Sequence, residues 1–318
     1  MRAIINSKST LKYWRFHRDE KINGVRRSHG NCLPVNIPDI DSWREKMPAG
    51  LSYPIDILVG SANAIRKSEI FKQHVYTRPT PGGCFVDIGD GIAVCSPEFT
   101  FFQMASEISL VKLIQLGLEF CGTYSLPADD KNKELDVATL YNRVPLTCVK
   151  DLKSFTARMR GVNGQKNTVW ALRHIADRSA SPMETIVFML LTLPVKHGGY
   201  SLPAPQLNKQ IDIGKLGTQI SGKNFNRCDL YCPEARLAVE YDSDTYHTGA
   251  ERLAEDSKRR SALKAIGIEV ITITAGQIKN ATEFDGMAKL IAKALGKRLR
   301  YHKTQFLKAQ NELRSQLF

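Results

Sequence analysis

The sequence predicts a mixed α/β (α+β) protein, because short strands and amphipathic helices alternate along the chain. Two short apolar runs flank Gly89-Asp90-Gly91, a sequence typical of a tight hairpin turn. Residues 179–318 follow the order helix, three strands, helix, strand and helix. The length of 318 residues suits about two domains of ~150 residues each. We therefore expect a smaller N-terminal α/β domain (1–125), a basic helical linker (126–178) and a C-terminal domain (179–318) with a mixed sheet flanked by helices.

The N-terminal domain is expected to contain a short helix, three strands and a longer helix. Residues 7–17 begin with Ser and Thr and continue with helical spacing, whereas residues 53–60 form a strand that ends at a glycine. The two runs within 83–97 form the hairpin. Ser96 then serves as the N-cap of a helix that is expected to reach Gly122, with a proline at its first position.

The C-terminal domain contains a second expected hairpin, whose turn is formed by Pro233 and Glu234. Its expected elements are an apolar helix over 181–194, a segment over 202–214 that passes from a Pro-rich turn into a strand, strands over 225–232 and 235–242, a helix over 250–267, a strand over 268–274, and a closing helix.

The charge and cysteine content narrow the class of protein. A net charge of +13 and a pI near 9.4 favour an acidic partner, with nucleic acid ahead of a membrane surface. The alternative is a protein that is merely basic. Seven scattered cysteines are typical of reduced thiols. The longest apolar run, 185–195, is far shorter than the ~20 residues that a bilayer span requires. We expect a soluble, cytoplasmic protein without a membrane partner.

Acidic residues gather where the strand 235–242 ends. Glu240 and Asp242 share one face of that strand, since side chains alternate along a strand. The hairpin turn brings Asp229 to within about one residue of the position opposite Glu240. Carboxylates on rigid strands are ligands that Mg²⁺ (or Mn²⁺) accepts, here Asp229 and Glu240. His247, a few residues further on, could then exchange a proton with a metal-activated water or a leaving oxygen.

Each of these residues also has a purely structural interpretation. The stretch that contains Asp242 and His247 could be a solvated turn after a strand. Glu184 stands three residues after Ser181, so a capping box explains it without catalysis. The basic run Lys258, Arg259 and Arg260 could contact phosphate oxygens, hold the acidic cluster in place, or lie on a solvated helix face.

Residues 181–274 resemble the domain family related to very-short-patch-repair (Vsr) endonucleases, within the PD-(D/E)XK or restriction-endonuclease-like superfamily. The similar segments, in order, are "SPMET", "LPAPQLN", "NRCDLYCPEARLAVEYDSDTYH" and "DSKRRSALKAIGIEVITIT". The last of them fits the family spacing D-x-x-R-x-x-x-L-x-x-x-G through Asp256, Arg259, Leu263 and Gly267.

The resemblance implies a four-stranded mixed sheet between helices and metal-dependent cleavage of phosphodiester bonds. It gives Asp229 and Glu240 the places of the two motif acids, and Glu184 that of the helix glutamate. Asp242 stands where many members of the superfamily have lysine, which leaves His247 as the candidate for activating water. Ser243 replaces a glycine that is frequent in this branch.

The N-terminal half resembles abortive-infection antitoxins of the AbiEi type through "YPIDILVG" and "GIAVCSPEFTFFQMAS". The resemblance implies a DNA-binding transcriptional regulator with a toxin partner, and it assigns no residue a role. The sequence as a whole predicts a Mg²⁺-dependent endonuclease that hydrolyses DNA, in repair or phage defence. The alternative is a non-catalytic DNA-binding regulator that retains a nuclease fold. A homodimer is compatible with either function.

Overall fold

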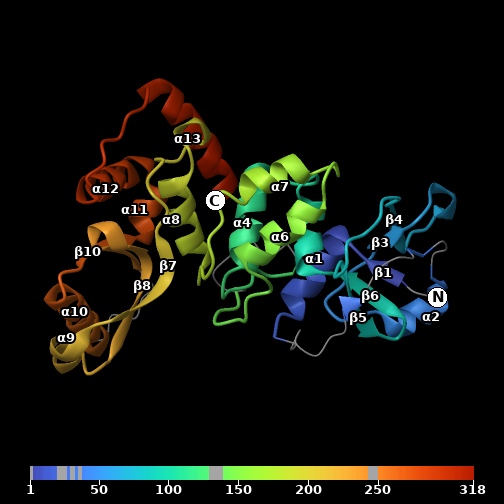
Figure 1. The fold of residues 1–318 in the computed structure, drawn as a ribbon, viewed down its shortest axis with the longest axis horizontal. Coiled ribbons are helices and arrows are strands. Elements are labelled where there is room, and N and C mark those ends of the chain that lie inside the picture. Colours follow the sequence, from blue (N-terminus) through green and yellow to red (C-terminus); the bar gives the residue numbers. More distant parts are fainter. Residues whose placement is uncertain (1–2, 20–26, 29–32, 35–37, 129–138, 243–249) are drawn as a thin grey trace. The chain divides into compact units, whose positions relative to one another are not determined.

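The computed structural model describes residues 3–19, 27–28, 33–34, 38–128, 139–242 and 250–318. The chain divides into two compact units, Met1–Ile175 and Ala176–Phe318 (Figure 1). Each unit contains a mixed sheet and helices, which confirms the mixed α/β class. Within the ranges above, no helix has the length and apolar character needed to cross a membrane.

The sheet of the first unit has the strand order β2-β5-β6-β1-β3-β4. In chain order its strands are β1 (Ala3–Ile5), β2 (Arg27–Ser28), β3 (Ile55–Val59), β4 (Phe71–Val75), β5 (Phe85–Gly89) and β6 (Ile92–Cys95). The pairs β1–β6 and β3–β4 are parallel and the other pairs are antiparallel. The predicted hairpin joins β5 to β6, and Asp90 and Gly91 in its turn have φ angles of 51° and 74°. Such left-handed conformations suit Asp and Gly.

The helices of the first unit are α1 (Ser7–Phe16), α2 (Ile40–Lys46), α3 (Pro97–Met104), α4 (Leu110–Phe120), α6 (Val149–Arg158) and α7 (Gln165–Ala171). Two of them, α3 and α6, contribute side chains to one apolar cluster. Phe99 and Phe102 of α3 pack against Phe155 of α6 and Met159, which follows α6, in the core beside β5 and β6. Thus α6, which lies in the segment expected to be a linker, contributes to the core of this unit.

The single helix expected from Ser96 to Gly122 is in fact two helices, α3 and α4. Ser96 caps α3 as expected, because its hydroxyl accepts the amide of Phe99. Ser109 interrupts the helical pattern and caps α4 by accepting the amide of Lys112. A serine that can cap a helix thus divides an otherwise continuous apolar pattern.

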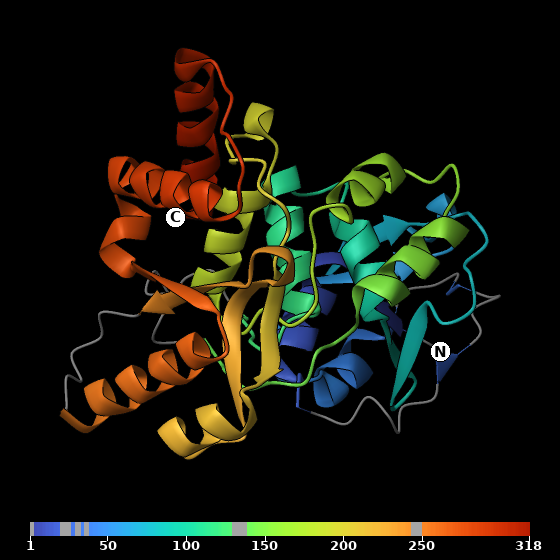
Figure 2. The same ribbon diagram turned by 60° about the vertical axis from the view of Figure 1, so that its left-hand side comes forward.

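The second unit has a four-stranded mixed sheet in the order β10-β9-β8-β7. Its strands are β7 (Gln206–Asp212), β8 (Phe225–Cys232), β9 (Leu237–Asp242) and β10 (Glu269–Thr274). The pairs β7–β8 and β8–β9 are antiparallel, and β9–β10 is parallel. Figure 2 shows this sheet with its helices.

Helices cover both faces of the second sheet. They are α8 (Pro182–Thr192), α9 (Gly214–Ser221), α10 (Ala250–Ala265), α11 (Ala275–Lys279), α12 (Ala281–Ala294) and α13 (Lys303–Leu317). Leu191 of α8 and Ile291 of α12 line an apolar space with Leu230 and Val239 of the sheet. Leu263 of α10 belongs to a separate cluster on the other face. The strands β8 and β9 therefore lie between α8 and α10.

Candidate active site

The β8–β9 hairpin brings the first two acids together. Leu230 lies opposite Val239 at the last paired position of these antiparallel strands, and Asp229 and Glu240 follow next to it, close enough for the charge of Asp229 to act on Glu240. Oδ2 of Asp229 accepts the backbone amide of Tyr241 at 2.9 Å. The aspartate side chain thus accepts a backbone N–H that would otherwise be available to a backbone carbonyl of a neighbouring strand. This hydrogen bond fixes the orientation of the Asp229 carboxylate.

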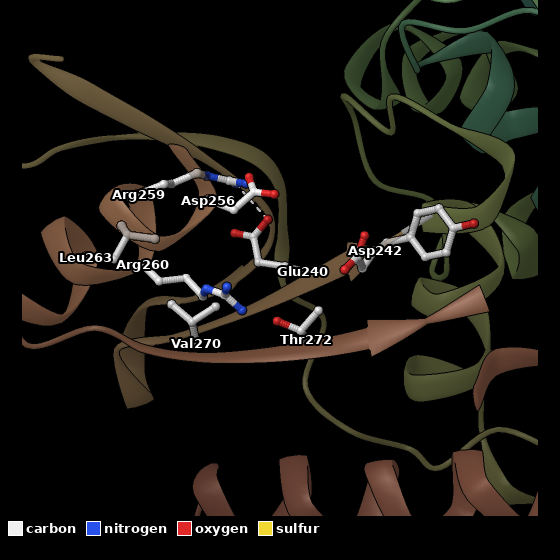
Figure 3. A pocket seen from close by; sticks show the side chains of 9 residues that line it. Glu240, Asp242, Asp256, Arg259, Arg260, Leu263, Val270 and Thr272 are labelled. Carbon is white, nitrogen blue, oxygen red and sulfur yellow. Dashed lines mark hydrogen bonds and ion pairs between the residues drawn. The ribbon is translucent and has the colours of Figure 1, made fainter. Parts of the chain in front are cut away.

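Glu240 is buried, with an exposed fraction of 8%, and its two oxygens have different surroundings. Oε2 forms an ion pair of 2.7 Å with Nη2 of Arg259, which reaches it from α10 (Figure 3). Oε1 is buried and has no hydrogen-bond partner among the residues that the structure describes. Burial and the charge of Asp229 raise the pKa of Glu240 to about 7, although Arg259 opposes the shift.

Glu184 approaches Asp229 from α8, which lies on the opposite face of the sheet from α10. Ser181 caps this helix by accepting the amide of Glu184 at 3.1 Å. Glu184 reaches back to the backbone amide of Ala180 at 3.0 Å and accepts the Ser181 hydroxyl. Burial and the charge of Asp229 raise its pKa to about 7. Glu184 therefore participates in helix capping and also lies within electrostatic reach of Asp229.

Asn208 of β7 is a site residue that the sequence analysis missed. Its Nδ2 donates to Oε2 of Glu184 at 2.5 Å and to the carbonyl of Arg178 at 3.0 Å. Its backbone has φ 47°, a left-handed conformation that asparagine adopts more readily than most residues. An asparagine within an expected strand was the one available signal, since strands are depleted in this residue.

Asp229 is the central member of this acidic cluster, which we define as Glu184, Asp229 and Glu240. Burial raises its pKa, while the Tyr241 amide and Arg259 lower it. Two buried acids and a partly buried one, with one nearby guanidinium, cannot all ionise without cost, because desolvation and mutual repulsion both favour the neutral forms. The single positive charge of Arg259 therefore does not balance the three carboxylates of the cluster when all are ionised.

A pocket of roughly 170 Å³ adjoins Glu240 between α10 and the strands β9 and β10. Its polar lining includes Asp242, Asp256, Arg260 and Thr272, in addition to the Glu240–Arg259 pair. Thr272 lies beside Glu240 in the β9–β10 register. Asp242 is exposed and lies farther along the strand, apart from the Glu240–Arg259 pair in Figure 3.

The remaining predicted residues are distributed differently. Lys258 lies on the exposed face of α10, outside the lining of the pocket. Arg260 faces the pocket, and Arg259 contacts the acidic cluster. His247 lies outside the described residues. The structure thus brings Glu184, Asp229, Glu240 and Arg259 together, with Asp242 and Arg260 beside them.

The carboxylate oxygens of this site are of the kind that binds a divalent cation, but their present arrangement does not form a metal site. Carboxylate oxygens are the ligands that Mg²⁺ prefers, and Oε1 of Glu240, which has no hydrogen-bond partner in the described part of the chain, is available as such a ligand. Nevertheless, among the residues described, no group of three His, Cys, Asp or Glu side chains could hold a metal ion as it stands. The Arg259 guanidinium instead occupies Oε2 of Glu240. The protein matches no family model, no curated protein and no solved structure.

Proposed function

We propose that this protein is a metal-dependent nuclease that hydrolyses phosphodiester bonds in DNA, with its active site at the acidic cluster. The observation that carries the proposal is the buried carboxyl of Glu240, which lies beside Asp229 and has one oxygen without a partner among the residues that are described. Buried acids are retained at such a cost mainly where a ligand or a reaction uses them.

The chain's own residues have distinct roles in this proposal. Asp229 and Glu240 would hold the cation, and Asn208 orients Glu184 at the edge of the site. Arg260 contacts a phosphate oxygen at the pocket, with Lys258 as a further contact to the DNA backbone. His247 keeps its predicted role in proton transfer. A bound Mg²⁺ or Mn²⁺ would lower the pKa of a water molecule and neutralise charge on the scissile phosphate.

The arrangement of the second unit supports assignment to the restriction-endonuclease-like fold. A four-stranded mixed sheet lies between helices, and acids from α8, β8 and β9 converge at the β8–β9 pair. This order of elements and acids agrees with what the Vsr resemblance implies.

A second function is favoured by the Glu240–Arg259 ion pair. A guanidinium that already neutralises Glu240 is compatible with a non-catalytic DNA-binding regulator in which the acidic cluster is structural. Such a protein would bind DNA equally well with and without divalent cations, and it would not cut any substrate.

Incubation of the full chain with plasmid and single-stranded DNA in Mg²⁺, Mn²⁺ or EDTA distinguishes the two functions. Cleavage that requires a divalent cation, and that Asp229→Asn abolishes, supports the nuclease. Binding without cleavage of either substrate in any of these buffers supports the regulator and contradicts the nuclease.

A further inference from the structure

One face of α7, in the first unit, combines an aromatic side chain with two cations. Lys166, Val169, Trp170 and Arg173 are spaced by three and four residues, and the turn that follows the helix keeps Arg173 in line. These four residues and Gln165 line an open hollow of roughly 280 Å³. We call this set the α7 face.

Trp170 differs from the other two tryptophans of the chain. Trp14 and Trp43 are buried, with 3% of their surface exposed, whereas Trp170 is only partly buried. Its ring contacts His174, with 4.6 Å between the ring centroids. Val169 beside it is 42% exposed. A partly exposed indole that lines a hollow presents part of its flat apolar surface to a ligand.

The charge around this indole indicates the chemistry of the ligand. Lys166 and Arg173 flank Trp170, and neither forms an ion pair with any residue that the structure describes. The segment 149–178 carries seven Lys or Arg and two Asp. Exposed cations of this segment on α6 include Lys150 and Lys153. An anionic ligand with a flat apolar part therefore complements the α7 face.

We propose that the α7 face binds single-stranded DNA, with an unpaired base stacked on Trp170 and the flanking phosphates held by Lys166 and Arg173. Stacking requires a base whose face is open, which a duplex does not offer except at its ends. The proposal rests on the proposed function only for the choice of DNA as partner. It adds a second contact, in the other unit, for a strand that is unpaired near the cut.

Binding of a fluorescent oligothymidylate and of a duplex of equal length to the full chain, in EDTA, tests this proposal. EDTA prevents metal-dependent cleavage, so the result does not depend on whether the acidic cluster is active. Trp170→Ala is expected to weaken single-strand binding by about tenfold and duplex binding by less than about twofold. Trp170→Phe, which keeps an aromatic face, should retain most of the affinity.

Lys166→Gln and Arg173→Gln should each weaken single-strand binding and reduce its salt dependence by about 0.7 in log–log slope. Val169→Ala is the matched control on the same face, and it should bind like the wild type. The proposal is overturned if Trp170→Ala binds the oligothymidylate as tightly as the wild type. It is also overturned if the Ala and Phe variants lose affinity equally, or if single strand and duplex are affected alike.

Discussion

Arg259 of α10 holds Glu240 of β9 through an ion pair of 2.7 Å between Nη2 and Oε2. The same guanidinium lowers the pKa of Asp229, so it acts on two members of the acidic cluster. A divalent cation that binds Glu240 and Asp229 would supply the charge that Arg259 now supplies. The ion pair and the metal therefore compete for Glu240, and this competition can be measured.

Replacement of Arg259 tests that relationship. Arg259→Gln leaves Glu240 buried without its counter-charge, and in EDTA it should lower the free energy of unfolding by about 1–2 kcal/mol. This value is below that of a fully buried pair because the Arg259 side chain is 34% exposed. Addition of Mn²⁺ should recover most of the loss. Arg260→Gln is the control, and urea unfolding measures both variants. Equal stability of Arg259→Gln and wild type in EDTA would contradict the role of the ion pair.

The raised pKa of Glu184 predicts a pH-dependent stability. Its pKa is about 7 in the folded chain against an ordinary value of 4.5. The folded protein then binds more protons than the unfolded chain between these values, so the free energy of unfolding contributed by this group falls as the pH rises from about 4.5 through about 7. Urea unfolding in EDTA at several pH values should show a smaller fall for Glu184→Gln. An identical pH profile for wild type and variant would refute the assignment.

Asn208 should be sensitive to both its backbone and its side chain. Asn208→Gly keeps the left-handed backbone but loses the bonds to Glu184 and Arg178, at a cost of about 1 kcal/mol. Asn208→Ala also strains a backbone with φ 47°, so it should cost about 1 kcal/mol more. Thermal unfolding of the two variants provides the measurement. An Ala variant as stable as the Gly variant would show that backbone conformation is unimportant here.

Lys258 and Arg260 should contribute to DNA affinity without a contribution to sequence preference. Lys258→Gln and Arg260→Gln should each lower the affinity for duplex DNA and reduce the log–log salt slope by about 1. Lys264→Gln, at an exposed position near the end of the same helix, is the matched control. Fluorescence anisotropy at a series of salt concentrations gives the slopes. An unchanged slope in the Arg260 variant would exclude a phosphate contact at the pocket.

Local signals explain what the sequence could predict. The hairpin turn at Pro233 lies within the η4 turn (Pro233–Ala235), and the pairing of β8 with β9 follows from it. The turn between β5 and β6 is likewise encoded by Gly89 and its two neighbours. Neighbouring residues determine such features, so a pattern read along the chain is sufficient.

Features that depend on distant packing were harder to predict. The choice among Lys258, Arg259 and Arg260 depends on the rotation of α10 against the sheet. The buried Leu263 indicates that rotation. It lies four residues after Arg259 on the same helix face, so Arg259 also points toward the sheet, where it pairs with Glu240. The contact between Asn208 and Glu184 joins residues 24 positions apart, and no local pattern encodes it.

The C-terminal segment combines a basic stretch with a helix that has a buried face. The Lys- and Arg-rich stretch 296–308 includes the start of α13, in which Phe306, Leu313 and Leu317 are buried. These apolar residues are spaced as on one face of a helix, but the mostly polar residues between them obscured the pattern.

Direct measurement of Mn²⁺ binding and DNA cleavage in Asp229→Asn and Glu240→Gln tests whether the acidic cluster is the active site of a metal-dependent nuclease. Both variants should lose metal binding and at least about a hundredfold of the cleavage rate, while their DNA affinity in EDTA stays equal or rises because negative charge is removed. Glu234→Gln, an exposed glutamate in the turn between the same strands, should behave like the wild type. Cleavage at the wild-type rate in both Asp229→Asn and Glu240→Gln would contradict an active site at the acidic cluster.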